Sequence, residues 1–506
     1  MKTLALGLMV FILGIFTACG GGSMASTNLP PPPPRNVNAS ITVDSTKNGP
    51  FNLAMSTSFQ PAEWDDTFFC SDINSCTSQT WSTAETTLLA NLEPHHVRLQ
   101  TVSQGVPESA SNTWDFSVLD AITQPVLSAG DHSPEMQLGW APSFMWSQGN
   151  MQGTLDVQAF ASYAQNMVRY YNTASGFTAN GQTFQSPGQY PIRWWGILNE
   201  PSINNISDTE YVQIYNTVVP RMQAVDSTLK FVAIELCCSS ESTYVPTFAA
   251  NLQSGVPVDA VATHYYSSCN QKDTDQQLMN TVPGFASSVQ NIYAYMSASA
   301  ALANVPVWIT ENNVNADFDK GGGISACNGT VFVTDDRGSS PFFAAWRPYV
   351  FSQVGKAGAQ ALYHWDFDAD KQYGEVDYNT ANTQLSYWVD YWLGQLFPAG
   401  SGQLLLQSTN SDTTDVEVLP VENADGSVVV MISNHAVASP NDNNGAGLTA
   451  DISVDTSALG AFTSASQLII DSSTNASAGP SPVSVSPASP IKLSLNGYSV
   501  AFIKLQ

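Results

Sequence analysis

The stretch that decides the fold reads RWWGILNEP and spans residues 193–201. It begins as a short apolar run, which is typical of a buried strand, and Glu200 follows directly after that run. A second stretch, PVWITENN at residues 306–313, repeats the arrangement with Glu311. We therefore expect two separate buried strands that each end at a carboxylate.

Six further apolar runs accompany these two, and helical patterns lie between most of them. The eight runs are 51–59, 96–102, 136–144, 193–198, 230–236, 258–264, 306–310 and 359–365, and helical patterns include 156–171, 208–225, 282–301 and 341–354. Eight buried strands with helical crossovers over about 300 residues predict an α/β fold, a (β/α)8 TIM barrel, at residues 49–398. An open doubly wound sheet is the rival, and the absence of a Gly-x-Gly-x-x-Gly or Walker motif after the first strand disfavours it.

The last hundred residues change character, because short strand-like runs follow one another without helical patterns. These runs are 404–406, 416–420, 427–433, 450–454, 467–471 and 498–504, and Asp425-Gly426 is a hairpin signal. They predict a C-terminal β-sandwich domain at residues 399–506. Residues 36–48 hold one more strand, since apolar and polar residues alternate from Asn36 to Asp44. We expect it to join the C-terminal domain, because a closed barrel has no free edge.

The first 35 residues predict export. Lys2 precedes an apolar run from Leu4 to Phe16, and small residues then lead to Cys19, as in a bacterial lipoprotein signal. We expect a signal peptide at 1–18, lipidation of Cys19, and a Gly- and Pro-rich tether at 19–35. Ordinary signal cleavage is the alternative. The protein would then be secreted, or held at the bacterial outer membrane or cell surface by its lipid alone.

Six cysteines remain after Cys19, an even number that fits disulfides in an oxidising compartment. Cys70 and Cys76 are near enough in sequence to close a small local loop. The pairing of the other four stays open at this level: Cys237, Cys238, Cys269 and Cys327.

Composition excludes several classes of partner. Sixteen basic residues stand against 42 acidic ones, which gives a net charge of −26. Neither nucleic acid nor an anionic membrane surface is therefore an expected partner. No Cys-x-x-Cys or His-x-x-x-His spacing occurs, so we expect no metal site. No Gly-x-Ser-x-Gly elbow of an esterase occurs either.

The two glutamates indicate acid–base chemistry at one end of the barrel. Active sites of TIM barrels lie at the C-terminal ends of the strands, and strands four and seven face each other across that mouth. Two carboxylates about 5–5.5 Å apart carry out retaining glycoside hydrolysis, in which one protonates the leaving oxygen and the other attacks the anomeric carbon. A single glutamate after a strand is usually a solvated cap, but a pair at Glu200 and Glu311 favours catalysis without a cofactor.

The surrounding motifs resemble those of clan A glycoside hydrolases. The two signatures of the clan correspond to Asn199-Glu200-Pro201 and Thr310-Glu311-Asn312. Residues 50–395 are most similar to glycoside hydrolase family 39, in the segments WDFSVLD (114–120), VDSTLK (225–230) and VDAVATHYY (258–266). Asn312 departs from the tryptophan that more usually follows the nucleophile. The resemblance implies a carbohydrate substrate, a plant or microbial poly- or oligosaccharide.

The resemblance also implies roles for the residues around the two glutamates. Glu200 would be the general acid/base and Glu311 the nucleophile. Asn199 would hydrogen-bond the 2-hydroxyl of the substrate, a contact that strengthens in the transition state. Arg98 would contact the nucleophile, with a purely structural ion pair as the alternative.

Further residues would line the substrate pocket. Tyr266 would hydrogen-bond the nucleophile, with Tyr265 as the competitor, because adjacent strand residues point to opposite faces. His264 would line the pocket or be a buried structural histidine. Aromatic platforms for sugar rings are expected after strands eight and three, with pure packing as the alternative, at Trp365, Trp140, Phe144 and Trp146.

The sequence thus predicts an exported, retaining O-glycosyl hydrolase. Two alternatives remain at this level. One is a non-catalytic glycan-binding surface lipoprotein, and the other is a transglycosylase that uses the same site.

Overall fold

The computed structural model describes residues 37–59, 83–92, 95–102, 105–130, 134–149, 151–188, 191–237, 240–378 and 380–506. The expected signal peptide and tether lie outside the described residues. Cys19, Cys70, Cys76 and Cys238 lie outside them too.

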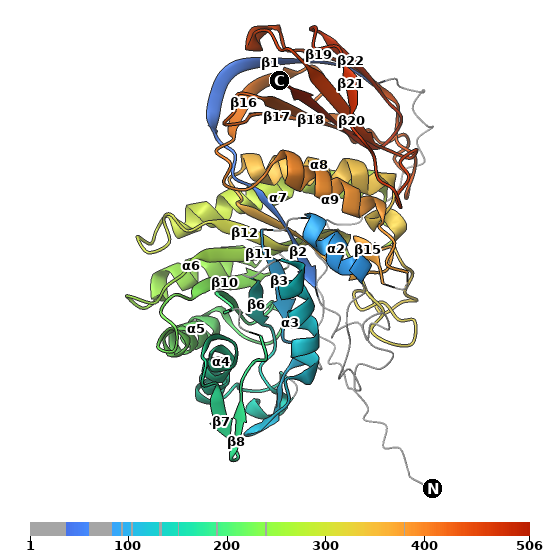
Figure 1. Cartoon of the computed structure of the whole chain (residues 1–506). Helices are drawn as coiled ribbons and strands as arrows, with labels where there is room; N and C mark the ends of the chain where they lie inside the picture. The colour runs from blue at the N-terminus through green and yellow to red at the C-terminus, as the bar shows by residue number, and fades with distance from the viewer. Residues whose placement is uncertain are drawn as a thin grey trace.

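Eight parallel strands close into a barrel in the order β10-β11-β12-β13-β2-β3-β6-β9, which confirms the TIM barrel and excludes the open sheet. They span Ala54–Phe59 (β2), Val97–Gln100 (β3), Glu135–Leu138 (β6), Trp194–Ile197 (β9), Lys230–Leu236 (β10), Ala260–Ser268 (β11), Val307–Asn315 (β12) and Ala361–His364 (β13). Each is followed along the chain by a helix of the outer ring (Figure 1). These helices span Thr83–Leu92 (α2), Ser117–Ala129 (α3), Val157–Asn172 (α4), Asp208–Gln223 (α5), Glu241–Asn251 (α6), Asp275–Met296 (α7), Pro341–Lys356 (α8) and Leu385–Leu396 (α9).

Short elements decorate the loops between these strands and helices. They are Glu108–Ala110 (β4), Thr113–Trp114 (β5), Ser143–Met145 (η3), Phe177–Ala179 (β7), Gln182–Phe184 (β8), Asp336–Gly338 (η4), Asp368–Ala369 (β14) and Val376–Asp377 (β15).

Helix α7 starts seven residues before the expected start at 282. Thr274 forms a capping box with Gln277, in which each side chain binds the backbone N–H of the other residue. This reciprocal cap satisfies amides that the first turn would otherwise leave without partners. The polar first turn therefore belongs to the helix, although the apolar pattern begins only later.

The C-terminal domain is one continuous mixed sheet of nine strands in the order β21-β20-β23-β18-β17-β16-β1-β19-β22. Apolar residues from both halves of this sheet meet in a single core, so the sheet curls into a half-barrel or sandwich. The strands span Val37–Pro50 (β1), Leu404–Asn410 (β16), Val416–Glu422 (β17), Val428–Asn434 (β18), Ala450–Asp455 (β19), Ala465–Ile470 (β20), Val483–Val485 (β21), Ile491–Leu495 (β22) and Ser499–Leu505 (β23), with a short helix at Ser457–Leu459 (η5).

Strand β1 carries the start of the described chain into this C-terminal sheet. It pairs antiparallel with β16 and parallel with β19, and Ile41 lies opposite both Asn410 and Val454. The alternating apolar residues of β1 are all buried in the core of the sheet: Val37, Ala39, Ile41 and Val43.

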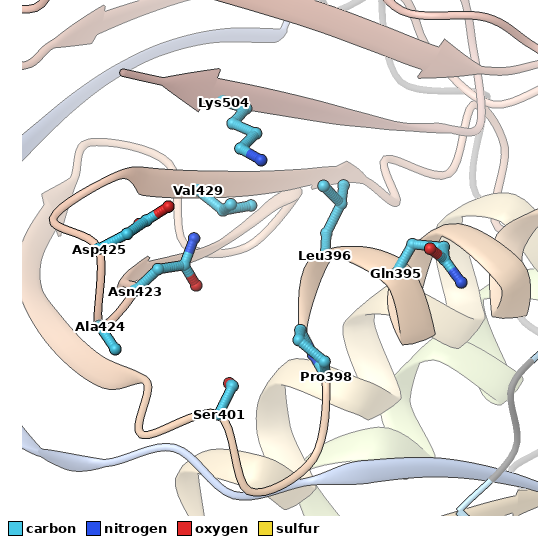
Figure 2. Close-up of a pocket in the computed structure, with 9 residues that line it drawn as sticks. All are labelled: Gln395, Leu396, Pro398, Ser401, Asn423, Ala424, Asp425, Val429 and Lys504. Carbon is cyan, nitrogen blue, oxygen red and sulfur yellow. The ribbon is translucent and has the colours of Figure 1, made fainter.

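Helices α8 and α9 lie between the barrel and the sheet (Figure 1). Glu417 of β17 accepts hydrogen bonds from three side chains of α8, at Ser352, Gln353 and Lys356. A crevice of about 290 Å³ opens beside the end of α9, between residues 395–401 and the turn at 423–425 (Figure 2). No residue of the predicted site lines it.

Among the described residues, no helix is both long enough and apolar enough to cross a membrane.

Besides the contacts of Glu417 with α8, a second set of hydrogen bonds joins the barrel to the C-terminal domain. It centres on Asp275, the first residue of α7. Its buried carboxylate accepts hydrogen bonds from the amides of Asn444 and Gly445, each at 2.8 Å, and from the Tyr498 hydroxyl at 3.1 Å. Arg337 contacts the same carboxylate at 3.3 Å.

We expect Asp275→Asn to lower the free energy of unfolding by roughly 1.5–3 kcal/mol, because hydrogen bonds to a charged group contribute about that much. Urea unfolding followed by tryptophan fluorescence measures the loss. Asp451→Asn makes the same change on the exposed face of β19 and serves as the control. An equal effect of the two substitutions would contradict the anchoring role of Asp275.

Candidate active site

A bulge in β12 turns Glu311 into the barrel. Ile309 lies opposite Thr263 of β11, but Glu311 lies opposite the next residue, His264, so β12 holds one extra residue here. Strict alternation from Trp308, which faces the interior, would place Glu311 outside. The bulge reverses this direction, as bulges beside active sites often do.

Glu311 does not end its strand, contrary to the sequence-based expectation. Strand β12 continues to Asn315, and the ladder with β11 persists as far as the pair Ser268–Asn315.

The carboxylate of Glu311 is surrounded by hydrogen-bond donors. Its Oε1 accepts from Arg98 Nη1 at 2.9 Å and from Gln100 Nε2 at 3.1 Å. Its Oε2 accepts from the Tyr266 hydroxyl at 2.8 Å. Burial by itself raises the pKa of Glu311, but the charges of His264 and Arg98, with the Tyr266 hydrogen bond, outweigh burial and hold that pKa below its ordinary value. The side chain is therefore kept ionised, as a nucleophile requires.

Glu200 stands three residues beyond the end of β9. Its backbone adopts a left-handed conformation, with φ of 44°, and its N–H donates to the carbonyl of Glu235 on β10. Its Oε1 lies 2.8 Å from His264 Nδ1. The Glu200 side chain is 17% exposed against 7% for Glu311, so it is the more accessible of the two carboxylates.

The two carboxylates lie close together. One oxygen of Glu200, one of Glu311 and a ring nitrogen of His264 all lie within 4.8 Å of one another. A closest approach below 4.8 Å is compatible with the 5–5.5 Å between the carboxyl groups of retaining glycosidases and is well below the roughly 6.5–9.5 Å of inverting ones.

Asn199 presents a fixed amide to the site. Its Oδ1 accepts hydrogen bonds from Arg98 Nη2 at 3.0 Å and Gln137 Nε2 at 3.0 Å, with Gln100 Nε2 at 3.4 Å. Since donors surround the oxygen, the amide nitrogen is the group that can donate to a substrate hydroxyl.

His264 lies between the two glutamates. Its Nδ1 is 2.8 Å from Glu200 and 3.4 Å from Glu311. Burial lowers the pKa of His264, but the charge of Glu311 and the contacts with Glu200 and Glu235 raise it to about 9. The imidazole is therefore a cation at neutral pH.

The tyrosine that reaches Glu311 is Tyr266. Alternation along β11 sends Tyr265 outward, where its ring stacks on Phe285 of α7 at 4.8 Å. Asn312 also points away from the site, because its side chain binds the Tyr265 carbonyl and Arg347. The residue that replaces the usual tryptophan is thus part of the wall behind the site.

The aromatic candidates divide into two groups. Trp365 follows β13 and packs with Tyr266 and Tyr373 in a small cluster beside the site, with the Arg98 guanidinium 6.0 Å from its ring. Trp140 is half-buried and Phe144 is exposed, but Trp146 is 5% exposed and belongs to the main core.

Four polar residues of the site were not expected from sequence. Gln100 and Gln137 orient Asn199, while Glu135 and Glu235 are fully buried in the barrel interior. A signal was present for Glu235, because it is an acidic residue inside the apolar run FVAIEL, and carboxylates are rarely buried without a partner.

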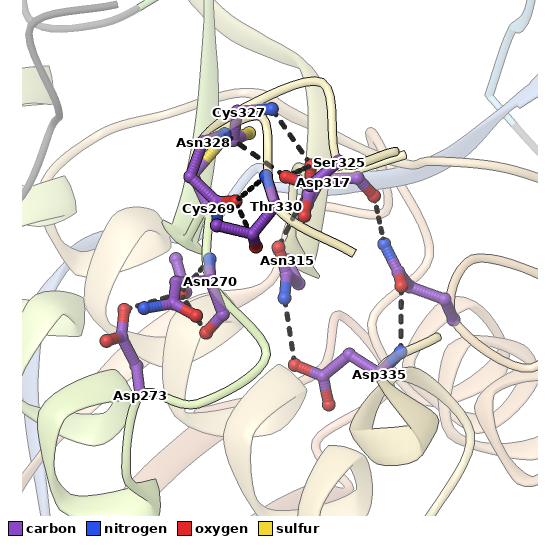
Figure 3. The surroundings of a disulfide bond; sticks show 12 residues. Cys269, Asn270, Asp273, Asn315, Asp317, Ser325, Cys327, Asn328, Thr330 and Asp335 are labelled. Atoms are coloured by element: carbon purple, nitrogen blue, oxygen red, sulfur yellow. Dashed lines mark hydrogen bonds between the residues drawn. A yellow bond between two sulfur atoms is a disulfide. The ribbon is translucent and has the colours of Figure 1, made fainter. Parts of the chain in front are cut away.

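A disulfide between Cys269 and Cys327 joins the loop after β11 to the loop after β12 (Figure 3). Asp317 braces the second loop by accepting hydrogen bonds from the Ser325 hydroxyl at 2.8 Å and the Cys327 amide at 3.0 Å. The Asp317 carbonyl also accepts from the Tyr373 hydroxyl, which ties this loop to the aromatic cluster. Both loops are thus fixed next to the site.

Two groups of described residues have metal-ligand chemistry: Glu200, His264 and Glu311, and His364, Glu375 and Asp390. In the first, a protonated imidazole offers no lone pair to a metal. In the second, Asp390 pairs with Arg347, and the His364 nitrogens lie 2.8 Å from Asp390 and 2.7 Å from the Tyr373 carbonyl. We assign neither group to a metal.

The raised pKa of His264 predicts how stability varies with pH. A group whose pKa rises on folding from 6.5 to about 9 contributes fully below pH 6.5, and that contribution is lost as the pH rises through 9. The free energy of unfolding of the wild type should therefore decline between pH 6.5 and 9. We expect His264→Gln to remove up to about 3 kcal/mol of this decline. Urea unfolding between pH 6 and pH 9.5 tests it.

His435→Gln is the matched control, since burial lowers the pKa of His435 to about 4 and leaves it neutral across this range. A decline in His264→Gln as steep as that of the wild type would contradict the assignment.

No protein-family model and no curated protein matches the sequence. Solved structures do match. A monomeric β-xylosidase from Caulobacter crescentus CB15 aligns with a TM-score of 0.64 and 14% identity, over 92% of this chain and 99% of that one. A GH51 arabinofuranosidase from Xanthomonas axonopodis pv. citri aligns at 0.62 and 12%, over 93% and 100%. The catalytic domain of the GH30 xylanase C from Talaromyces cellulolyticus aligns at 0.58 and 15%, over 92% and 100%.

These likenesses extend over the barrel and the C-terminal sheet together. At such identities they show a shared fold and do not assign the chain to one family. The structure is therefore similar to clan A glycoside hydrolases, with families 39, 51 and 30 all represented among its neighbours.

Proposed function

We propose that this protein is a retaining glycoside hydrolase that cleaves a plant or microbial poly- or oligosaccharide. The observation that carries the proposal is the pair of carboxylates, Glu200 and Glu311, with oxygens within 4.8 Å at the mouth of a barrel. The fold supports it, because solved neighbours include a β-xylosidase, an arabinofuranosidase and a xylanase.

In the first step, Glu200 donates its proton to the glycosidic oxygen while Glu311 attacks the anomeric carbon. The bond to the leaving group breaks and an ester bond to Glu311 forms. In the second step, Glu200 takes a proton from water as the water oxygen attacks the same carbon. The ester bond then breaks, and two inversions give a product with retained configuration.

The surrounding groups support this division of labour. Arg98 and Tyr266 hold Glu311 ionised and aimed, so it suits the nucleophile. Glu200 is more exposed and receives no contact from Arg98 in the described structure, so it suits proton transfer to a leaving group. In the proposed mechanism, Asn199 donates to the 2-hydroxyl and Trp365 stacks on the sugar face.

We also propose that the protein is exported, with lipidation at Cys19. The Cys269–Cys327 disulfide supports an oxidising compartment, where such bonds persist.

The proposed mechanism fixes the stereochemistry of the product. Because the carboxylates are too close for a water molecule to attack between them, the first-formed sugar should have the anomeric configuration of the substrate. Proton NMR of early hydrolysis, on whichever aryl xyloside, arabinofuranoside, galactoside or glucoside is cleaved, measures this directly. Inversion would contradict the double displacement.

Substitutions of the two glutamates separate their roles. Glu311→Gln should abolish turnover, and Glu200→Gln should slow hydrolysis of a poor leaving group about 10²–10⁴-fold. In Glu200→Ala, added azide should restore turnover and give a glycosyl azide of retained configuration. In Glu311→Ala, it should give the inverted azide.

Glu422→Gln, on the C-terminal sheet, is the control for the charge change and should keep wild-type turnover. Exchange of the two azide outcomes would reverse the roles. Glycan binding with no hydrolysis by the wild type would favour the non-catalytic alternative.

A further inference from the structure

We infer that Glu235, on β10, is a positioning residue that holds the acid/base and the nucleophile in register with each other. The inference rests on the proposed function of Glu200 and Glu311. Glu235 contacts no reacting atom in that mechanism. It acts on one catalytic residue through its side chain and on the other through its backbone.

The side chain acts on the nucleophile through Arg98. Glu235 Oε2 accepts from Arg98 Nε at 3.0 Å and from Arg98 Nη2 at 2.7 Å, and both side chains are fully buried. The remaining nitrogen, Nη1, then points at Glu311. A guanidinium is planar and rigid, so two bonds to Glu235 fix the direction of the third nitrogen.

The backbone acts on the acid/base. The carbonyl of Glu235 accepts the N–H of Glu200 at 3.1 Å, at the left-handed turn that follows β9. A non-glycine residue with positive φ persists only where its surroundings hold it there. The hydrogen bond from Glu200 to Glu235 is one of those constraints.

Two local features of the backbone accommodate the Glu235 side chain: a bulge in β10 and a glycine on the neighbouring strand. Strand β10 has a bulge between Ala233 and Leu236, with positive φ at Ile234 and Glu235. The Tyr211 hydroxyl accepts the Ile234 amide at 2.6 Å within this bulge. On the neighbouring strand, Gly196 leaves space, because a Cβ there would come within 2.1 Å of Glu235 Oε1.

Glu235 also balances the charge of the barrel interior. Arg98 and His264 are cations, and His264 Nε2 lies 3.9 Å from Glu235 Oε2. Glu311 supplies one negative charge and Glu235 the second. The other described groups around this space are Glu200, Glu135, Tyr266 and Tyr363, with Tyr211 behind the bulge of β10. Without Glu235, one of the two positive charges would have no counter-charge, and it would stabilise the ionised forms of the catalytic carboxyls more strongly.

The test is Glu235→Gln, which keeps the shape of the side chain and removes its charge. We expect kcat to fall about 10- to 100-fold with a small change in KM, because misplacement of a catalytic group costs up to about 10²-fold. We also expect both limbs of the pH–rate profile to move to lower pH, since uncompensated cations favour the ionised carboxyls. A residue with a merely structural role would not move these limbs.

Glu241→Gln is the matched control, because Glu241 is also buried but lies on α6 outside the barrel. It should keep the wild-type kcat and pH profile. The inference would be overturned if Glu235→Gln kept the wild-type kcat and the wild-type pH–rate profile. In the same assay, Glu311→Gln should stay inactive. An inactive wild type would instead overturn the proposed function, and the role of Glu235 with it.

If Glu235→Gln does not fold, Gly196→Ala takes its place, since the added methyl displaces the Glu235 carboxylate, and Gln137 beside it, without removing a charge. It should lower kcat and slow the covalent labelling of Glu311 by a 2-deoxy-2-fluoro glycoside, followed by intact mass. Labelling at the wild-type rate would overturn the inference.

Discussion

The candidate active site depends on one buried cation. Arg98 is fully buried and is shared by two carboxylates and the oxygen of an amide, on three different strands or strand ends. An unpaired charge in such a place would be very costly, so Arg98 needs the two carboxylates that contact it to stay in position as counter-charges. The same requirement fixes Asn199, holds Glu311 as an anion, and explains why an acidic residue stands in the middle of the buried strand β10.

Two bulges provide the geometry that this arrangement needs. In a regular strand, only every second side chain faces the interior. Each strand therefore contributes few inward-pointing side chains at the barrel mouth. An extra residue in β10 and another in β12 add inward positions at the level of the barrel mouth. Polar side chains from neighbouring strands can therefore contact one another in a single layer of the barrel interior. This polar layer lies next to the apolar and aromatic layer around Trp308.

The sequence predicts the barrel and the pairing of Glu200 with Glu311, because apolar runs and strand ends are properties of short segments. Simple alternation along β11 predicts that only one of Tyr265 and Tyr266 points inward, and the structure shows that it is Tyr266. The inward direction of Glu235 and the continuation of β12 to Asn315 could not be predicted in this way, because bulges and strand lengths depend on pairing with a neighbouring strand. The single curled sheet has the same cause, since strand runs alone do not tell whether two halves join through β1.

The position of β1 has a consequence for how the chain is made. Val43 pairs with Ser408 and Val37 with Ala450, so the first described strand finds its neighbours only after the whole barrel has been synthesised. Until then its apolar side chains have no partner sheet, and an unpaired strand is an aggregation hazard. The C-terminal sheet can therefore be completed only after the barrel has been synthesised. Any fragment that ends with the barrel lacks the strands with which β1 pairs.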